Sequence, residues 1–177
     1  NGTCFKVVNT KAQNDNQIRT IMSGNLTLSK FETGVELSSP SANYDVTGII
    51  ENITFSNVTV NIHIYPVNAY KLTFNDMSLN GDVGIYYGGA TKANSGELIT
   101  FNNVFTGNLG CIFKAEAFGE FTFINSSFDS SCLAFDCNYT YISCINCHFE
   151  NLNARKDYRY YGLIHAKDKR THLTMSN

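Results

Sequence analysis

The 177-residue sequence predicts an all-β fold, a parallel β-helix of about six to seven coils with surface insertions. Three observations support this prediction: a short phrase recurs along the chain, its copies are one β-coil apart, and apolar and polar residues alternate around each copy. Each copy consists of a polar residue, a large apolar residue, a variable residue and then Asn or Asp. The clearest copies are Thr54–Asn57, Thr73–Asp76, Thr100–Asn103, Thr122–Asn125 and Ser143–Asn146.

The large apolar residue of each copy serves as an anchor, and weaker copies at Thr27–Ser29 and Thr174–Asn177 extend the series. Successive anchors are 27, 19, 27, 22, 21 and 31 residues apart. The short steps fit one coil, and the long steps fit a coil with a surface insertion. We therefore expect the anchors to stack in one internal column, with Phe55, Phe74, Phe101 and Phe123 in contact. The complete series is Leu28, Phe55, Phe74, Phe101, Phe123, Cys144 and Met175.

A second strand is expected about ten residues after each anchor, for example at Ile62–Tyr65 and Gly84–Tyr87. The Asn or Asp two positions after each anchor is expected at a turn, where Asn tolerates the left-handed conformation and its amide can bond from coil to coil. An immunoglobulin-like β-sandwich is the alternative all-β fold, but it does not explain one phrase per coil. The expected turn ladder is Asn57, Asp76, Asn103, Asn125, Asn146 and Asn177.

One domain is predicted, with residues 1–24 as an N-terminal edge or capping segment and residues 25–177 as the β-helix. The sequence contains no signal peptide and no apolar run long enough to span a membrane. The net charge is -2, but residues 1–154 hold 7 Lys+Arg and 13 Asp+Glu, whereas residues 155–177 hold 6 and 2. The acidic body argues against nucleic acid and against a membrane surface as partners.

Six cysteines and six Asn-x-Ser/Thr sequons together favour a secreted or cell-surface glycoprotein. Glycans at Asn57 and Asn125 are expected to be hindered, because both residues fall on the turn ladder. Asn25, Asn52 and Asn138 are the preferred sites, and Asn1 is accessible as a terminus.

The cysteines predict disulfides rather than a metal site. Cys111 and Cys132 follow successive anchors by ten and nine residues, so they are expected to pair. A second local pair is expected among Cys137, Cys144 and Cys147, and Cys137 with Cys147 is the preferred choice. Cys4 is isolated in the sequence and is expected to pair with one of these cysteines or with another chain. Zinc bound by Cys132, Cys137, Cys144, Cys147 and His148 is the alternative; it rests on a single Cys-x-x-Cys, and no metal or cofactor is expected.

The Phe-x-Asn phrase and Gly88-Gly89-Ala90 give residues 25–177 a resemblance to the right-handed parallel β-helix superfamily. This superfamily includes pectin-lyase-like proteins and the repeats of polymorphic outer-membrane adhesins. Those adhesins usually carry Phe-x-x-Asn, and Gly-Gly-Ala occurs here only once. The resemblance therefore implies an architecture whose members are polysaccharide lyases and hydrolases, or adhesins and fibres.

No catalytic residues are predicted. Asp129 and Asp136 flank one coil and Asp76 and Asp82 another, but none forms an Asp-Asp pair, and isolated aspartates are common in turns. His63 and His165 are interpreted as wall or core residues of apolar strands. A non-enzymatic protein is expected, with a polysaccharide lyase or hydrolase as the alternative.

A basic and aromatic insertion at residues 154–161 is the candidate binding loop, since aromatic rings beside arginine suit extracellular glycans. The preferred interpretation is nevertheless a solvated surface loop that lengthens the 31-residue step. The residues expected to bind are Arg155, Lys156, Tyr158, Arg159, Tyr160 and Tyr161.

The repeated phrase is still in progress at Asn177, and no capping helix follows it. An open strand edge invites another chain, so either more protein follows or a neighbouring copy supplies the next coil. Head-to-tail self-association into a filament is expected, with Lys167, Lys169 and Arg170 facing an acidic neighbour. The predicted function is a secreted, glycosylated structural protein, either a fibre subunit or an adhesin module. A carbohydrate-active enzyme or glycan-binding module is the alternative.

Overall fold

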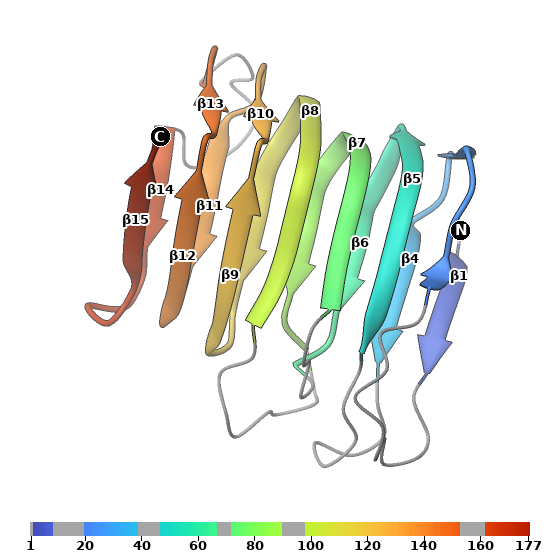
Figure 1. Cartoon of the computed structure of the whole chain (residues 1–177), viewed down its shortest axis with the longest axis horizontal. Helices are drawn as coiled ribbons and strands as arrows, with labels where there is room; N and C mark the ends of the chain where they lie inside the picture. Colours follow the sequence, from blue (N-terminus) through green and yellow to red (C-terminus); the bar gives the residue numbers. More distant parts are fainter. Residues whose placement is uncertain (1, 9–19, 39–46, 67–71, 90–97, 153–161) are drawn as a thin grey trace.

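The computed structural model describes residues 2–8, 20–38, 47–66, 72–89, 98–152 and 162–177. These residues form a parallel β-solenoid of about five turns, in which the strands of successive coils lie side by side (Figure 1). Only strands occur as regular elements in the described ranges, and the two ends of the chain lie at opposite ends of the solenoid. No helix in these ranges is long and apolar enough to cross a membrane.

The described residues form fifteen strands. Their bounds are β1 Thr3–Val8, β2 Thr20–Met22, β3 Leu26–Ser29, β4 Thr33–Ser38, β5 Gly48–Ser56, β6 Val58–Ile64, β7 Leu72–Tyr87, β8 Leu98–Ala115, β9 Gly119–Ile124, β10 Ser127–Phe128, β11 Leu133–Cys137, β12 Thr140–Ile145, β13 His148–Phe149, β14 Gly162–Ala166 and β15 His172–Ser176.

Three parallel ladders run along the solenoid. The first contains β2, β5, β7, β8, β9, β12 and β15, and the second contains β1, β4, β6, β7, β8, β11 and β14. The third ladder is narrower and forms the third side of the solenoid. In it β3 pairs with β5, and β10 pairs with β8 and β13. Every pairing among the described strands is parallel, which confirms the solenoid and rules out the antiparallel β-sandwich.

Two corners per coil place non-glycine residues in the left-handed conformation. The first corner contains Asn52, Asp76, Asn103, Asn125 and Asn146, with φ between 50° and 61°. Asn is the residue that tolerates this conformation best after glycine, which is why the phrase ends in Asn. The amide of Asn146 donates to Asn125 Oδ1 at 2.8 Å, and Asn103 donates to Asp76, so the ladder bonds from coil to coil as predicted.

Asn57 was assigned to this ladder incorrectly. It lies at the second corner with Lys30, Asn108, Ser130 and Asn151, where φ is between 48° and 63°. The phrase fits both corners because it describes any strand that ends in a left-handed turn. Asn52 occupies the first-corner position that Asn57 was expected to fill.

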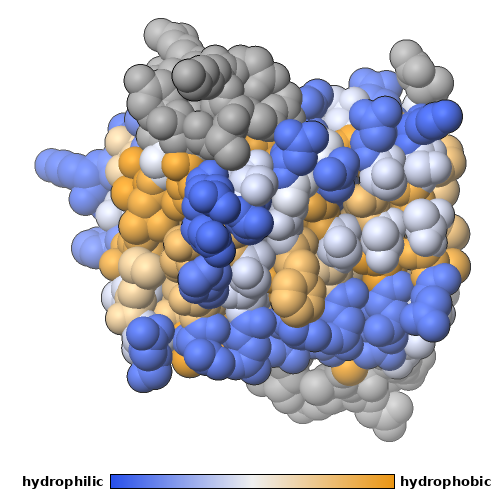
Figure 2. All heavy atoms as spheres, turned by 90° about the horizontal axis from the view of Figure 1, so that it is seen from above, coloured by the Kyte–Doolittle hydropathy of each residue, from blue (hydrophilic) through white to orange (hydrophobic). Residues whose placement is uncertain are grey.

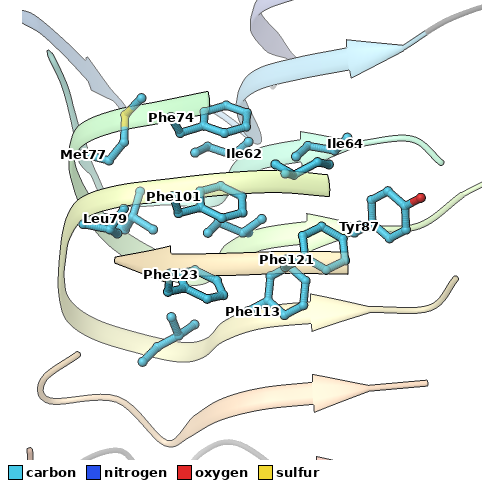
Figure 3. Close-up of a cluster of buried hydrophobic side chains, with 14 of the residues drawn as sticks. Ile62, Ile64, Phe74, Met77, Leu79, Tyr87, Phe101, Phe113, Phe121 and Phe123 are labelled. Atoms are coloured by element: carbon cyan, nitrogen blue, oxygen red, sulfur yellow. The ribbon is translucent and has the colours of Figure 1, made fainter. Parts of the chain in front are cut away.

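The core contains a column of stacked aromatic rings. Phe74 stacks on Phe101 and Phe101 on Phe123, with ring centroids 4.9 and 5.0 Å apart and interplanar angles of 12° and 15° (Figure 3). Ile50 precedes this column, and Cys144 follows it.

Phe55 is buried but does not belong to the column, which corrects the prediction. Its strand partner is Leu28, and both lie on the third side. The structure has about five turns, slightly fewer than the six to seven coils predicted.

The described parts of the first 24 residues include two strands of the solenoid, β1 and β2. β1 is the edge strand beside β4, and β2 pairs with β5.

Candidate functional site

Inward-facing side chains become exposed at the two ends of the solenoid. Met175 is 53% exposed and Ile164 38% exposed at the end that carries β14 and β15, and Phe5 is 37% exposed at the opposite end. Their strand partners one coil inward, Cys144, Phe135 and Val35, are all buried. Figure 2 shows hydrophobic atoms gathered at the end with β14 and β15, on the left. We call the exposed residues Phe5, Ile164 and Met175 the end surfaces.

The same ends carry open strand edges. Among the described residues, β1 pairs only with β4, β14 only with β11, and β15 only with β12. The outer side of each of these strands therefore has no strand partner within the described residues, and such an edge can template another parallel strand.

The predicted assembly cations lie at the end with β14 and β15, but two of them are paired within the chain. Lys167 Nζ lies 2.9 Å from Asp136 Oδ1, and Arg170 Nη2 lies 2.7 Å from Asp168 Oδ2. Arg170 also covers the ring of Tyr139 at 3.9 Å. Hydrogen bonds from Arg170 lower the pKa of Asp168 to about 2. Lys169 is exposed beside them.

A row of ionisable and aromatic residues crosses the second ladder, one residue from each of seven strands. Each member lies opposite the next in register, so their side chains follow one line along the solenoid. In order along the sheet, the row is Lys6, Glu36, His63, Tyr86, Lys114, Asp136 and His165. We call this set the polar row.

Two carboxylates of the polar row are buried and paired. Glu36 bonds to Lys6 at 2.8 Å and accepts a hydrogen bond from Thr3, and these contacts lower its pKa against the opposing effect of burial. Asp136 has only 5% of its side chain exposed and lies 2.9 Å from both His165 Nδ1 and Lys167 Nζ. Because a buried charge without a partner is costly, these pairs make the row compatible with a stable sheet.

The aromatic members of the row are stacked on each other. The ring of His63 lies 4.7 Å from Tyr86 and 4.2 Å from Tyr65, and Lys114 covers Tyr86 at 5.1 Å. Tyr86 donates a hydrogen bond of 2.6 Å to Glu116. Burial, together with this bond, raises the pKa of Tyr86 to about 12, so its hydroxyl stays protonated at neutral pH.

The polar row is best interpreted as a stabilising ladder. Its ring faces are occupied by neighbouring rings, which leaves little surface on which a sugar could stack, and its carboxylates are already paired. His63 and His165 are wall residues, as the sequence predicted. The row as a whole was not predicted from the sequence. A signal for it exists, because each member from Glu36 to His165 comes directly after an inward-facing apolar residue in the second strand of its coil.

Replacing Tyr86 with phenylalanine removes the hydrogen bond to Glu116 and is expected to lower the free energy of unfolding by about 0.5–1 kcal/mol at neutral pH. The loss is small because Glu116 is partly exposed and solvent screens its charge. The bond from Tyr86 lowers the pKa of Glu116, so its contribution is present above the unfolded pKa of about 4.3 and is lost as the pH falls through the folded value. It is lost again as the pH rises from about 10 towards 12.

Denaturant unfolding of Tyr86→Phe from acidic to alkaline pH measures this effect. Tyr141→Phe, on the exposed surface of β12, is the matched control and is expected to leave stability unchanged. A difference between Tyr86→Phe and the native chain that persists below pH 3 would contradict the assignment of the bond to ionised Glu116.

Four of the six predicted glycosylation sites are exposed: Asn25, Asn57, Asn125 and Asn138. Asn52 is half-buried at the first corner, and Asn1 lies outside the described residues. The amide of Asn125 takes part in the corner ladder. Asn57 is therefore a more accessible position than its sequence context suggested, and Asn52 a less accessible one.

No disulfide is present among the described residues, which include all six cysteines. The predicted Cys111–Cys132 bond is not formed, and the register explains why: Cys111 lies opposite Leu133, so Cys132 is one residue out of step. Cys137 is buried in β11, and its predicted bond to Cys147 is also not formed.

Within the described ranges, no group of three His, Cys, Asp or Glu side chains is arranged to hold a metal ion, so the alternative zinc set does not come together. Asp76 and Asp129 lie at or beside corners, where Asp129 accepts hydrogen bonds from Asn151 and Ser130. These aspartates therefore serve as turn residues.

The candidate binding loop lies outside the described residues; it comprises Arg155, Lys156, Tyr158, Arg159, Tyr160 and Tyr161.

Comparison of the chain with protein-family models, with curated proteins and with solved structures gives no significant match.

Proposed function

We propose that this chain is a structural β-solenoid module, a fibre subunit or adhesin module, that associates end to end with a second copy. The observation that carries the proposal is the pair of end surfaces, where Phe5, Ile164 and Met175 are exposed although their strand partners one coil inward are buried. A neighbouring coil would remove these side chains from water and satisfy the open edges of β1, β14 and β15.

The in-chain register suggests how two copies would meet. Ile164 lies opposite Phe135 and Phe5 lies opposite Val35 in register, so β14 of one copy beside β1 of the next would bring Ile164 next to Phe5. Such a head-to-tail contact repeats without closing and therefore builds a filament.

Charge is a weaker driving force than the sequence suggested. In the described residues 2–8 and 20–38, Lys6 and Lys30 balance Glu32 and Glu36, so this part of the chain is not acidic. Lys167 and Arg170 are paired within the chain. Association through the end surfaces is consequently expected to persist at high salt, because apolar burial is not screened by ions.

Sedimentation velocity over a range of concentrations tests the proposal. Met175→Asp and Phe5→Asp are each expected to weaken association at least tenfold, since losing about 1.4 kcal/mol of contact changes an equilibrium constant by that factor. Phe105→Asp is the matched control: Phe105 is 50% exposed, but on the side of the solenoid, and its replacement should leave association unchanged. A native chain that stays monomeric at high concentration would overturn the proposal.

The proposal includes secretion and glycosylation. Exposed sequons at Asn25, Asn57, Asn125 and Asn138 support it, together with the unusual number of cysteines. When the chain is produced through a eukaryotic secretory pathway, glycosidase treatment is expected to reduce its mass, and peptide mapping should place the glycans on these exposed residues. Glycans confined to half-buried Asn52 would contradict this ranking.

A further inference from the structure

The first and second ladders of the solenoid are offset from each other by one coil. Each complete coil gives one strand, or one part of a long strand, to both ladders, and β2 shares a coil with β4 because their partners β5 and β6 are consecutive. β1 lies one coil outside β4 in the second ladder, whereas no described strand lies outside β2 in the first. The end with β1 therefore projects by half a coil, on the side of the second ladder.

The opposite end projects by half a coil on the side of the first ladder. β12 and β14 share a coil, since their partners β9 and β11 do, and β15 lies one coil beyond β12. No described strand lies beyond β14 in the second ladder. β15 and β1 are accordingly the outermost strands at the two ends (Figure 1). The two ends are therefore complementary, because each supplies the half-coil that the other lacks.

We propose that β15 of one copy and β1 of the next copy together form one complete coil, which the two copies share. This inference rests on the end-to-end association proposed above and defines its contact. β1 of the second copy would pair with β14 of the first, and β15 of the first copy would pair with β2 of the second. Both ladders would then run without interruption from one copy into the next.

The register within the chain assigns the apolar contact inside the shared coil. Met175 follows Phe123 and Cys144 in the column of the first ladder, and Phe5 belongs to the inward-facing row of the second ladder that contains Phe135. In the coil of β9 and β11, Phe123 and Phe135 face each other with ring centroids 5.7 Å apart. Met175 of one copy and Phe5 of the next would face each other in the same way, so each would cover the other's exposed side chain.

The outward-facing residues fit the same register. Thr174 would lie beside Thr20, because both belong to the outward row that runs through Thr100. In the second ladder His165 would lie beside Lys6, and both would keep the buried carboxylates that they contact within the chain. The shared coil therefore requires no change in the ion pairs of either copy.

Disulfide trapping between two different variants tests the shared coil. A chain with Thr174→Cys and Ala166→Cys is mixed under mild oxidation with a chain that carries Thr20→Cys and Val7→Cys. The register places Ala166 beside Val7, as it places Thr174 beside Thr20. Cα atoms of neighbouring strands lie about 4.8 Å apart, within the range of a disulfide. Peptide mapping is expected to find both bonds, from position 174 to 20 and from position 166 to 7.

The controls separate this contact from other modes of association. Thr174→Cys mixed with Val7→Cys should give no bond, because these positions lie in different ladders. Each double variant alone should form no bond between the introduced cysteines of two copies, and the native chain under the same oxidation controls for its own cysteines. A bond from 166 to 7 without one from 174 to 20 would overturn the shared coil, because β14 would then lie beside β1 without β15 beside β2.

Sedimentation velocity of the same samples before oxidation distinguishes failure of this inference from failure of the proposed function. Association without either bond would overturn the shared coil and leave end-to-end association standing. Monomers at every concentration would overturn both.

A second measurement requires no added cysteine. Met175→Ala and Phe5→Ala are each expected to raise the dissociation constant of the end-to-end contact about tenfold. The double variant should raise it about 30-fold rather than about 100-fold, because residues in contact do not contribute independently. Met175→Ala combined with Phe105→Ala is the matched control and should behave like Met175→Ala, since Phe105 lies on the side of the solenoid. A Met175 and Phe5 double variant whose effect equals the product of the single effects would exclude their contact across a shared coil.

Discussion

Replacing Phe101 with alanine is expected to lower the free energy of unfolding by about 3–5 kcal/mol, the range for large-to-small changes in a packed core. Phe101 is completely buried, and its ring is stacked between those of Phe74 and Phe123. The substitution removes both stacking contacts and leaves a cavity between two coils. Rigid parallel ladders on both sides prevent the coils from closing the cavity, because each strand is held in register by its neighbours.

Denaturant unfolding followed by circular dichroism measures the loss, and Phe105→Ala provides a matched control. Phe105 lies in the same strand, β8, but is 50% exposed, so its replacement is expected to change stability by no more than about 0.5 kcal/mol. Similar losses for the two variants would show that the Phe101 column does not carry the core. In a solenoid each coil contacts mainly its neighbours, so Phe101→Ala should also broaden the transition.

The repeated phrase predicted the solenoid because the same residue types return at the same place in each coil. Inward-facing Phe and corner Asn have different physical requirements, and their fixed spacing encodes a strand followed by a left-handed turn. The register was less predictable. Phe55 and Phe74 share the phrase, but they lie on different sides, since both sides end in the same kind of corner.

The polar row and the end surfaces depend on information that no single coil contains. The row mixes acids, bases and aromatic rings, so residues such as Glu36 and Tyr86 do not resemble repeats of one another, although they share a register. Likewise, the charge of Lys167 suggested an intermolecular contact, whereas Asp136, 31 residues earlier in the chain, lies one coil away and neutralises it.

Replacing Gly81 with alanine is expected to destabilise the fold by about 3–5 kcal/mol, which combines backbone strain with a clash that side-chain movement cannot relieve. Gly81 has a φ of 152°, and an added Cβ would lie 1.7 Å from the carbonyl oxygen of Val58 and 2.8 Å from its carbon. These atoms are backbone atoms of the adjacent strand β6, which pairs with Gly81 in the ladder.

The neighbouring backbone has little freedom to move away. The buried side chain of Asn61 donates to the carbonyl oxygens of Val58 and Asn80 and accepts from the backbone N–H of Asn80, so it fixes both strands at the bulge beside Gly81. Gly107→Ala is the matched control, because an added Cβ there meets nothing within 4 Å, and a change of no more than about 0.5 kcal/mol is expected. Equilibrium unfolding of the two variants under the same conditions measures the difference. Equal stabilities would mean that the strands at Gly81 do not approach as closely as the Asn61 hydrogen bonds require.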